Sequence, residues 1–188
     1  MNGSLFVHMT KKRSTAILRI CCCLAFVSTA LAQSATEMPT TEGDSLAGHK
    51  VVLPGAAAGK VAVLVFGFTK ASKVQTSAWA SKLQADFRTR PDFEFYQLPV
   101  LEDVPRFVRG MVISGMRKGV AEDKRDHFVP ILQGEAELKK FVHYKEPDDA
   151  YLVVLDRAGK ILQQSHGSPD DASYARLRID IESALNQK

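Results

Sequence analysis

The most reactive side chains of this chain belong to three consecutive cysteines, Cys21 to Cys23. Thiolates act as nucleophiles, redox centres and metal ligands. These three lie in the apolar stretch 20–32, which follows a basic segment and ends in Ala30-Leu31-Ala32. That order is typical of a secretory signal peptide. We therefore expect residues 1–32 to be a signal that is cleaved between Ala32 and Gln33, leaving a mature chain without a thiol.

Two other interpretations of the N-terminal segment remain open. It could be kept as a membrane anchor, although an apolar stretch of this length is short for a bilayer-spanning helix. It could also be a lipoprotein signal, although Leu18-Arg19-Ile20 lacks the small residues expected before a lipidated cysteine. Cleavage remains our prediction, and with it a secreted or periplasmic location.

The net charge depends on this signal. The full chain has 25 basic and 21 acidic residues, and four of the basic ones lie before Ala32. The mature chain therefore carries 21 residues of each sign. A neutral chain gives no reason to expect nucleic-acid binding.

The polar side chains after the signal predict no catalytic or metal centre. The four histidines there are not spaced as ligands on one element; they are His49, His127, His143 and His166. Ser72 lacks the surroundings of a hydrolase nucleophile and lies where a helix N-cap is expected. Lys70 and Lys73 could hold an anion at that helix start, although solvated lysines are simpler. We expect no catalytic residue, no metal and no cofactor.

Segment 104–118 indicates binding instead of catalysis. Its predicted helix has an apolar surface wider than one stripe, with basic side chains beside it. Flexible methionines with arginines at the rim are typical of adaptable protein-binding or membrane-surface patches. The predicted partner-binding residues are Phe107, Met111, Met116, Arg106, Arg109, Arg117 and Lys118. The alternative is that this helix packs its apolar face on a sheet.

Strands and helices alternate around these residues. The apolar run 61–66 predicts a strand buried on both faces, and helical spacing follows over 72–88. A strand over 93–98 should be parallel to the first, because such crossovers are right-handed. The remaining predicted elements are a short strand over 49–53, helices over 103–118 and 135–142, a hairpin over 151–165 and a final helix from 168.

These elements predict one α/β domain over 46–188. The roughly 156 residues that follow Ala32 are enough for one domain with a full core. We expect a central mixed sheet of about four to five strands with helices on both faces. Residues 33–45, rich in Thr, Ser and Ala, predict a flexible leader.

This order of elements resembles that of the thioredoxin-like superfamily. Phe66-Gly67-Phe68-Thr69 is similar to the strand end that precedes the active cysteines of thioredoxin-like copper-delivery proteins and peroxiredoxins. The stretch 151–161, an apolar strand followed by D-x-x-G-x-I, is similar to the last hairpin of the family. The resemblance covers residues 42–186 and implies a thioredoxin-like three-layer sandwich.

The chain departs from that superfamily at the residues that carry its chemistry. Where relatives have C-x-x-C or C-x-x-x-C, it has Ala71 with Val74 or Gln75. Ala150 stands at the position of the cis-proline, and Asp148 stands near that of the copper proteins' histidine. The resemblance therefore implies a scaffold without thiol chemistry.

One subfamily also lacks the redox pair, namely the thioredoxin-like assembly factors for the membrane sector of ATP synthase. This chain is similar to them around Leu46 to Pro54, at Trp79 and in the hairpin 151–161. That resemblance implies a protein that escorts a membrane-protein subunit and is not an enzyme.

We thus expect an exported, redox-inactive binding or assembly module with chaperone-like action. Its expected partner is a protein, such as a membrane-protein subunit, with a membrane surface as a further candidate contact, and we expect a monomer that binds no nucleic acid. The alternatives are a thioredoxin-like oxidoreductase or peroxidase relative with non-cysteine chemistry, and an envelope metallochaperone.

Overall fold

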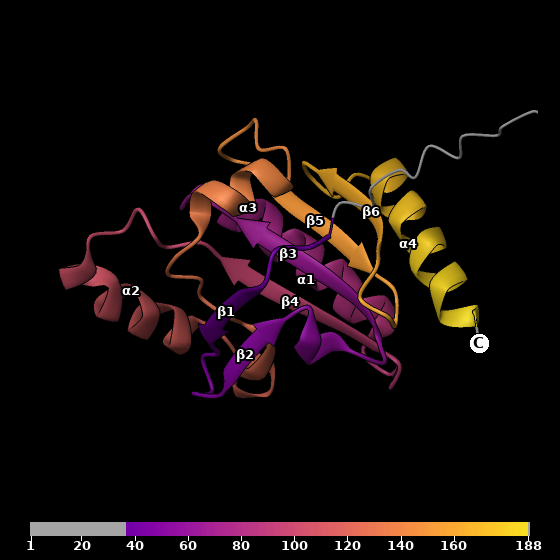
Figure 1. Ribbon diagram of the computed structural model, residues 1–188, viewed down its shortest axis with the longest axis horizontal. Coiled ribbons are helices and arrows are strands. Elements are labelled where there is room, and N and C mark those ends of the chain that lie inside the picture. The colour runs from indigo at the N-terminus through magenta and orange to yellow at the C-terminus, as the bar shows by residue number, and fades with distance from the viewer. Residues whose placement is uncertain (1–36, 188) are drawn as a thin grey trace, which may run out of the picture. The chain divides into compact units, whose positions relative to one another are not determined.

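The computed structural model describes residues 37–187, so the predicted signal peptide lies outside the described residues. These residues form a four-stranded mixed sheet with helices against both faces, and a separate two-stranded hairpin (Figure 1). The order of strands in the main sheet is β4-β3-β5-β6. Its strands are β3 (Val61–Gly67), β4 (Phe93–Pro99), β5 (Ala150–Leu155) and β6 (Ile161–His166).

Two strand directions agree with the sequence-based prediction, namely β4 parallel to β3 and β6 antiparallel to β5. Strands β3 and β4 are parallel, and α1 (Lys73–Phe87) forms the crossover between them. Strand β5 is antiparallel to both β3 and β6. The β5–β6 turn places Gly159 at φ 80°, a backbone conformation that glycine adopts without a steric penalty.

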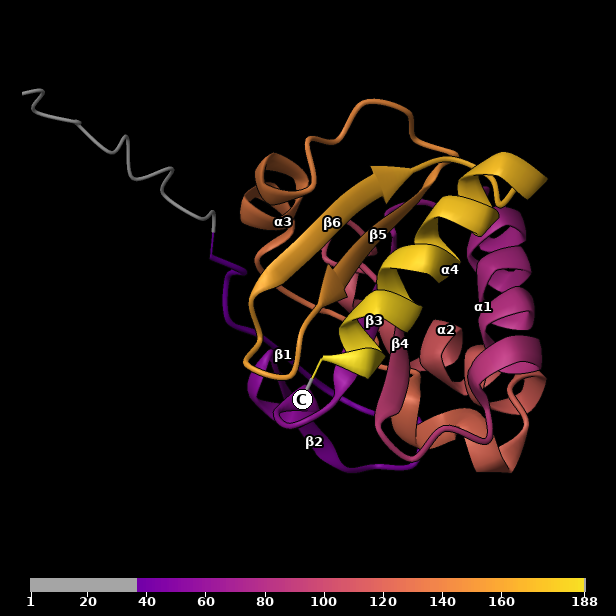
Figure 2. The same ribbon diagram turned by 90° about the vertical axis from the view of Figure 1, so that its right-hand side faces the viewer.

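Both faces of the sheet are buried, which explains the continuous apolar run in β3. Side chains alternate across a strand, so Val61, Val63 and Val65 share one core cluster with residues of α1 and of α4 (Asp171–Asn186). Figure 2 shows these two helices next to each other. The residues between these valines, Ala62, Leu64 and Phe66, belong to a second cluster with α3 (Glu135–Phe141).

The hairpin of β1 (Thr41–Asp44) and β2 (Lys50–Leu53) contributes to the second cluster and corrects the predicted leader. Met38, Thr41 and Ser45 are buried, so the flexible leader expected over 33–45 is wrong for its second half. Residues 33–36 lie outside the described range. The polar composition was misleading because β1 is stabilised by pairing with β2 and not by apolar content of its own.

Short elements complete the domain. They are the two 3₁₀ turns η1 (Gly55–Ala57) and η2 (Glu122–His127). After η2 the chain runs along β4, where the amides of Val129 and Ile131 donate to the carbonyls of Gln97 and Pro99. This segment therefore covers the outer edge of β4.

Helix α2 (Arg106–Gly119) begins later than the sequence suggested. Pro105, in an extended conformation, is its N-cap residue and provides no side-chain cap. Among residues 37–187, no helix is both long and apolar enough to cross a membrane.

Candidate functional site

The turn between β3 and α1 lies where the family resemblance places the active cysteines. It closes on itself through Thr69 and Ser72. The amide of Ser72 donates to Thr69 Oγ1 at 3.2 Å, and the Ser72 hydroxyl donates back to the Thr69 carbonyl at 2.8 Å. Ser72 is buried and its backbone is already helical. Ser72 is the N-cap residue of α1, as predicted, but its side chain makes no capping bond, because its hydroxyl points back into the turn.

Gly67 permits this tight turn at the end of β3. A Cβ atom added at this position would lie 2.7 Å from Ser72 Oγ and 3.1 Å from Thr76 Cγ2. Both contacts are shorter than ordinary van der Waals distances, so a larger residue would displace the start of α1. Glycine thus lets the strand and the helix approach closely.

Gln75 connects the first turn of α1 to the loop before β5. Its Nε2 donates to Asp149 Oδ1 at 3.1 Å, and its Oε1 accepts from the amide of Ala150 at 3.2 Å. Asp149 Oδ2 in turn lies 2.7 Å from Nδ1 of His166 on β6. We call Gln75, Asp149, Ala150 and His166 the Gln75 network. It joins α1, β5 and β6 at one end of the sheet.

Tyr151 of β5 also binds the loop 143–149. Tyr151 is fully buried. Its hydroxyl accepts hydrogen bonds from the amides of Lys145 and Glu146, each at 2.8 Å, and donates one to the Glu146 carbonyl at 3.0 Å. Its ring stacks on that of Tyr144 at 5.4 Å. Thr69 adds a bond from its hydroxyl to the Pro147 carbonyl at 2.8 Å. The loop is therefore fixed against the β3–α1 turn.

Helix α2 carries all the predicted partner-binding residues, and it packs differently from the alternative of a helix lying on the sheet. None of its residues is buried, so that alternative is wrong. Phe107 and Met111 are 88% and 77% exposed. Figure 1 shows α2 extending away from the sheet on the side opposite to α4.

The predicted patch is divided between two sides of α2. Met116 follows Phe107 by nine positions, which is two and a half turns at 3.6 residues per turn. Met116 therefore lies on the half-buried side, with Val108 and Val112. Phe107 and Met111 lie on the outward side. The sequence pattern alone did not distinguish the two sides, because both are apolar.

The basic residues of the patch also have different roles. Arg109 donates to the carbonyls of Val104 and Glu102 at 2.8 and 2.5 Å, which fixes the segment that leads into α2. Arg117 donates to the carbonyl of Leu46 at 2.9 Å and ties the end of α2 to the β1–β2 turn. Arg106 and Lys118 are exposed, and neither forms an ion pair with another described residue. Only these last two are free to meet a partner's charges.

No protein-family model matches the chain, and no curated protein matches it by sequence. Solved structures do match its fold. BsSco, a member of the Sco family of cytochrome c oxidase assembly proteins, has a TM-score of 0.56 at 16% identity, over 81% of this chain and 95% of its own.

Two further structures agree with this match. A thiol:disulfide interchange protein, named DsbE, from Chlorobium tepidum has a TM-score of 0.55 at 20% identity, over 80% of this chain and 96% of its own. A SCO1/SenC family lipoprotein from Bacillus anthracis str. Ames has a TM-score of 0.54 at 15% identity, over 80% and 95%. The fold is thioredoxin-like. The predicted fold class is thus confirmed, while identities this low establish the fold alone.

In this thioredoxin-like domain, the side chains at the start of α1 hold the loop 143–149 in place. The Asp149–His166 pair orients an imidazole, as catalytic dyads do. However, no serine, threonine or cysteine within residues 37–187 forms a hydrogen bond to His166. Nor does that part of the chain bring together three metal-ligating side chains. The side chains at this site make structural bonds with one another.

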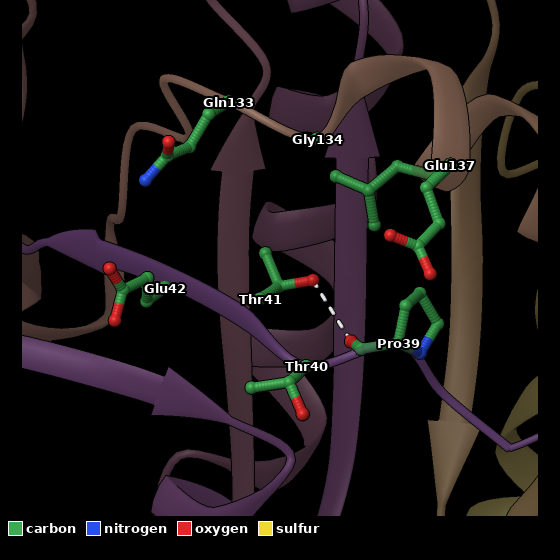
Figure 3. A pocket seen from close by; sticks show the side chains of 8 residues that line it. Pro39, Thr40, Thr41, Glu42, Gln133, Gly134 and Glu137 are labelled. Atoms are coloured by element: carbon green, nitrogen blue, oxygen red, sulfur yellow. Dashed lines mark hydrogen bonds between the residues drawn. The ribbon is translucent and has the colours of Figure 1, made fainter.

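A shallow pocket elsewhere in the thioredoxin-like domain does not change this conclusion. It has a volume of about 260 Å³ and lies between the segment before β1 and the start of α3 (Figure 3). The Thr41 hydroxyl on its wall donates to the Pro39 carbonyl at 3.0 Å, and Glu42 pairs with Lys50 at 3.0 Å. The Thr41 hydroxyl and the Glu42 carboxylate are therefore already paired within the chain.

Replacing Gln75 tests the network. Gln75→Ala leaves the Ala150 amide and one Asp149 oxygen without their partner, so we expect a loss of about 1–3 kcal/mol in the free energy of unfolding. Urea denaturation measures this loss, and the Ala150 amide should exchange its hydrogen faster. Val74→Ala is the matched control, because Val74 is 77% exposed and should change stability by less than about 0.5 kcal/mol. Equal stability of the two variants would contradict the assigned role of Gln75.

Proposed function

We propose that this chain is an exported, redox-inactive thioredoxin-like protein that binds and helps to assemble a protein partner. The observation that carries this proposal is the use of the site at the start of α1. At the positions where relatives have cysteines, Gln75 bonds to Asp149 and Ala150, while Ala71 and Val74 are exposed and unreactive. Because the side chains at the start of α1 form structural hydrogen bonds and carry no reactive group, the function that we propose for this domain is binding through its other surfaces.

Two further observations support an assembly role. The name of BsSco places it in a family of assembly proteins, so a domain of this fold can serve assembly. In addition, α2 exposes Phe107 and Met111 and leaves Arg106 and Lys118 unpaired among the described residues. Exposed apolar side chains beside arginine are typical of protein interfaces. The partner that we propose is a protein, with a membrane-protein subunit as the first candidate.

The proposal predicts no thiol-disulfide or peroxidase activity. In insulin-reduction and peroxide-consumption assays, the chain from Gln33 onward should give the same rate as a heat-inactivated sample, because thiol chemistry requires a thiolate and this part of the chain has no cysteine. A variant with Cys21, Cys22 and Cys23 all changed to Ser is the control for the cysteines of the N-terminal segment. Turnover that survives in this variant would refute the binding-module proposal and favour non-cysteine redox chemistry.

Location and metal binding are tested separately. N-terminal sequencing of the exported protein should begin at Gln33, if cleavage follows Ala32. Titration with copper should show no tight site. Tight binding of one copper ion would instead favour the envelope metallochaperone.

A further inference from the structure

The outward side of α2 has a regular pattern of exposed residues. Phe107, Gly110, Met111 and Ser114 follow one another at the spacing i, i+3, i+4 and i+7, and all four are exposed. This spacing places side chains along one face of a helix. Two large apolar side chains thus alternate with two very small residues. No other described element covers this face, since no residue of α2 is buried.

Gly110 is not explained by contacts within the domain. A Cβ atom added there would meet no atom within 4 Å, and its φ is that of an ordinary helical residue. Glycine within a helix is unfavourable relative to alanine, because it loses more backbone freedom on folding. The open space at Gly110, next to Phe107 and Met111, leaves room for the close approach of a partner's backbone.

The charges beside this face are all positive. Segment 104–120 contains no acidic residue. Arg109 and Arg117 bind carbonyls of their own chain, which leaves Arg106 and Lys118 at the two ends of the outward face. A partner that covers Phe107 and Met111 therefore needs carboxylates that lie opposite these two cations.

A uniformly anionic lipid surface fits this pattern poorly. Exposed acids lie just before and just after α2, namely Glu102, Asp103, Glu122 and Asp123. They would approach the headgroups together with the cations and oppose binding. A second copy of α2 also fits poorly, since two faces that carry only cations repel each other. A protein partner can vary its charge over this short distance.

We infer that the outward face of α2 docks one helix of another protein, which has an apolar stripe flanked by Asp or Glu. The stripe packs on Phe107 and Met111, the partner's backbone approaches over Gly110 and Ser114, and its carboxylates pair with Arg106 and Lys118. This inference rests on the proposed binding function and specifies the partner that the face accepts.

A synthetic helical peptide tests this docking. The probe is an amphipathic helix as long as α2 with a leucine stripe flanked by glutamates, and the matched control peptide has lysines in place of the glutamates. Titrated into the full chain, the glutamate peptide should bind in fluorescence anisotropy and the lysine peptide should not. Phe107→Ser, Met111→Ser and Gly110→Leu should each weaken binding about tenfold or more. Ile179→Ser, at an exposed residue on α4, should leave it unchanged.

A charge exchange separates docking from a structural effect. In the double variant Arg106→Glu and Lys118→Glu, the preference should reverse toward the lysine peptide. Gly110→Leu adds a helix-favouring residue in open space, so it should lose binding without a lower melting temperature.

Several results would overturn the inference. The first is that the glutamate peptide does not bind, or binds equally well to the Phe107 and Gly110 variants. The second is that the chain binds phosphatidylglycerol vesicles instead of the peptide, in a way that depends on Phe107. The third is that the chain forms dimers in sedimentation that depend on Phe107. Failure of the peptide test with silent redox assays would remove only this docking mode. Thiol-independent turnover would instead refute the proposed function, whatever the peptide does.

Discussion

Trp79→Ala should lower the free energy of unfolding by about 3–5 kcal/mol, the largest loss that we expect from a single substitution. Trp79 is among the largest fully buried side chains and shares a core cluster with Leu83 of α1 and Ile181 of α4. Its indole nitrogen also donates to the Gly167 carbonyl at 2.8 Å. The substitution would leave a cavity between both helices and the sheet, and would leave this carbonyl without its partner.

Trp79→Phe separates the two contributions. It keeps most of the apolar volume and removes the indole donor, so we expect a loss of about 1–3 kcal/mol. Urea denaturation of both variants beside Val74→Ala provides the comparison. If Trp79→Ala were as stable as Val74→Ala, the packing of α1 and α4 described here would be incorrect.

Tyr151→Phe is the second substitution with a large expected effect, because a single oxygen atom serves three backbone groups. Without the hydroxyl, the amides of Lys145 and Glu146 and the carbonyl of Glu146 all lose a partner. The ring contacts remain, so no large cavity forms. We expect a loss of about 2–3 kcal/mol in the free energy of unfolding, since an unsatisfied buried polar group costs about 1–3 kcal/mol.

Hydrogen exchange measures the local part of this effect. In Tyr151→Phe, the amides of Lys145 and Glu146 should lose protection far more than those in the centre of β3. Tyr144→Phe is the matched control, because Tyr144 packs against Tyr151 and none of the hydrogen bonds described for this loop uses its hydroxyl. Equal protection in Tyr151→Phe and Tyr144→Phe would show that the loop 143–149 is held by its other contacts.

Tyr151 and Gln75 together explain how the loop 143–149 is held in place beside α1. In this domain, the hydroxyl of Tyr151 and the carboxamide of Gln75 both form hydrogen bonds that fix this loop. Gln75 can make two bonds at once, because a carboxamide is both donor and acceptor. A side chain used in this way stabilises the edge of the sheet.

The sequence by itself determined the elements whose signals are local. The run 61–66 predicted β3, the D-x-x-G-x-I pattern predicted the β5–β6 hairpin, and the absence of cysteines after residue 23 excluded a thiol at the start of α1. Periodicity and turn residues carry this information because they depend on neighbours within a few positions.

Only the tertiary structure decided which surfaces meet. It paired β1 with β2, joined Gln75 to Asp149 and Ala150, and left the outward side of α2 uncovered. A pattern of apolar residues indicates that one face of an element is apolar, but it does not indicate which element or partner covers that face. The partners of Gln75 lie more than 70 positions away along the chain, so only the folding of the sheet brings them within hydrogen-bonding distance.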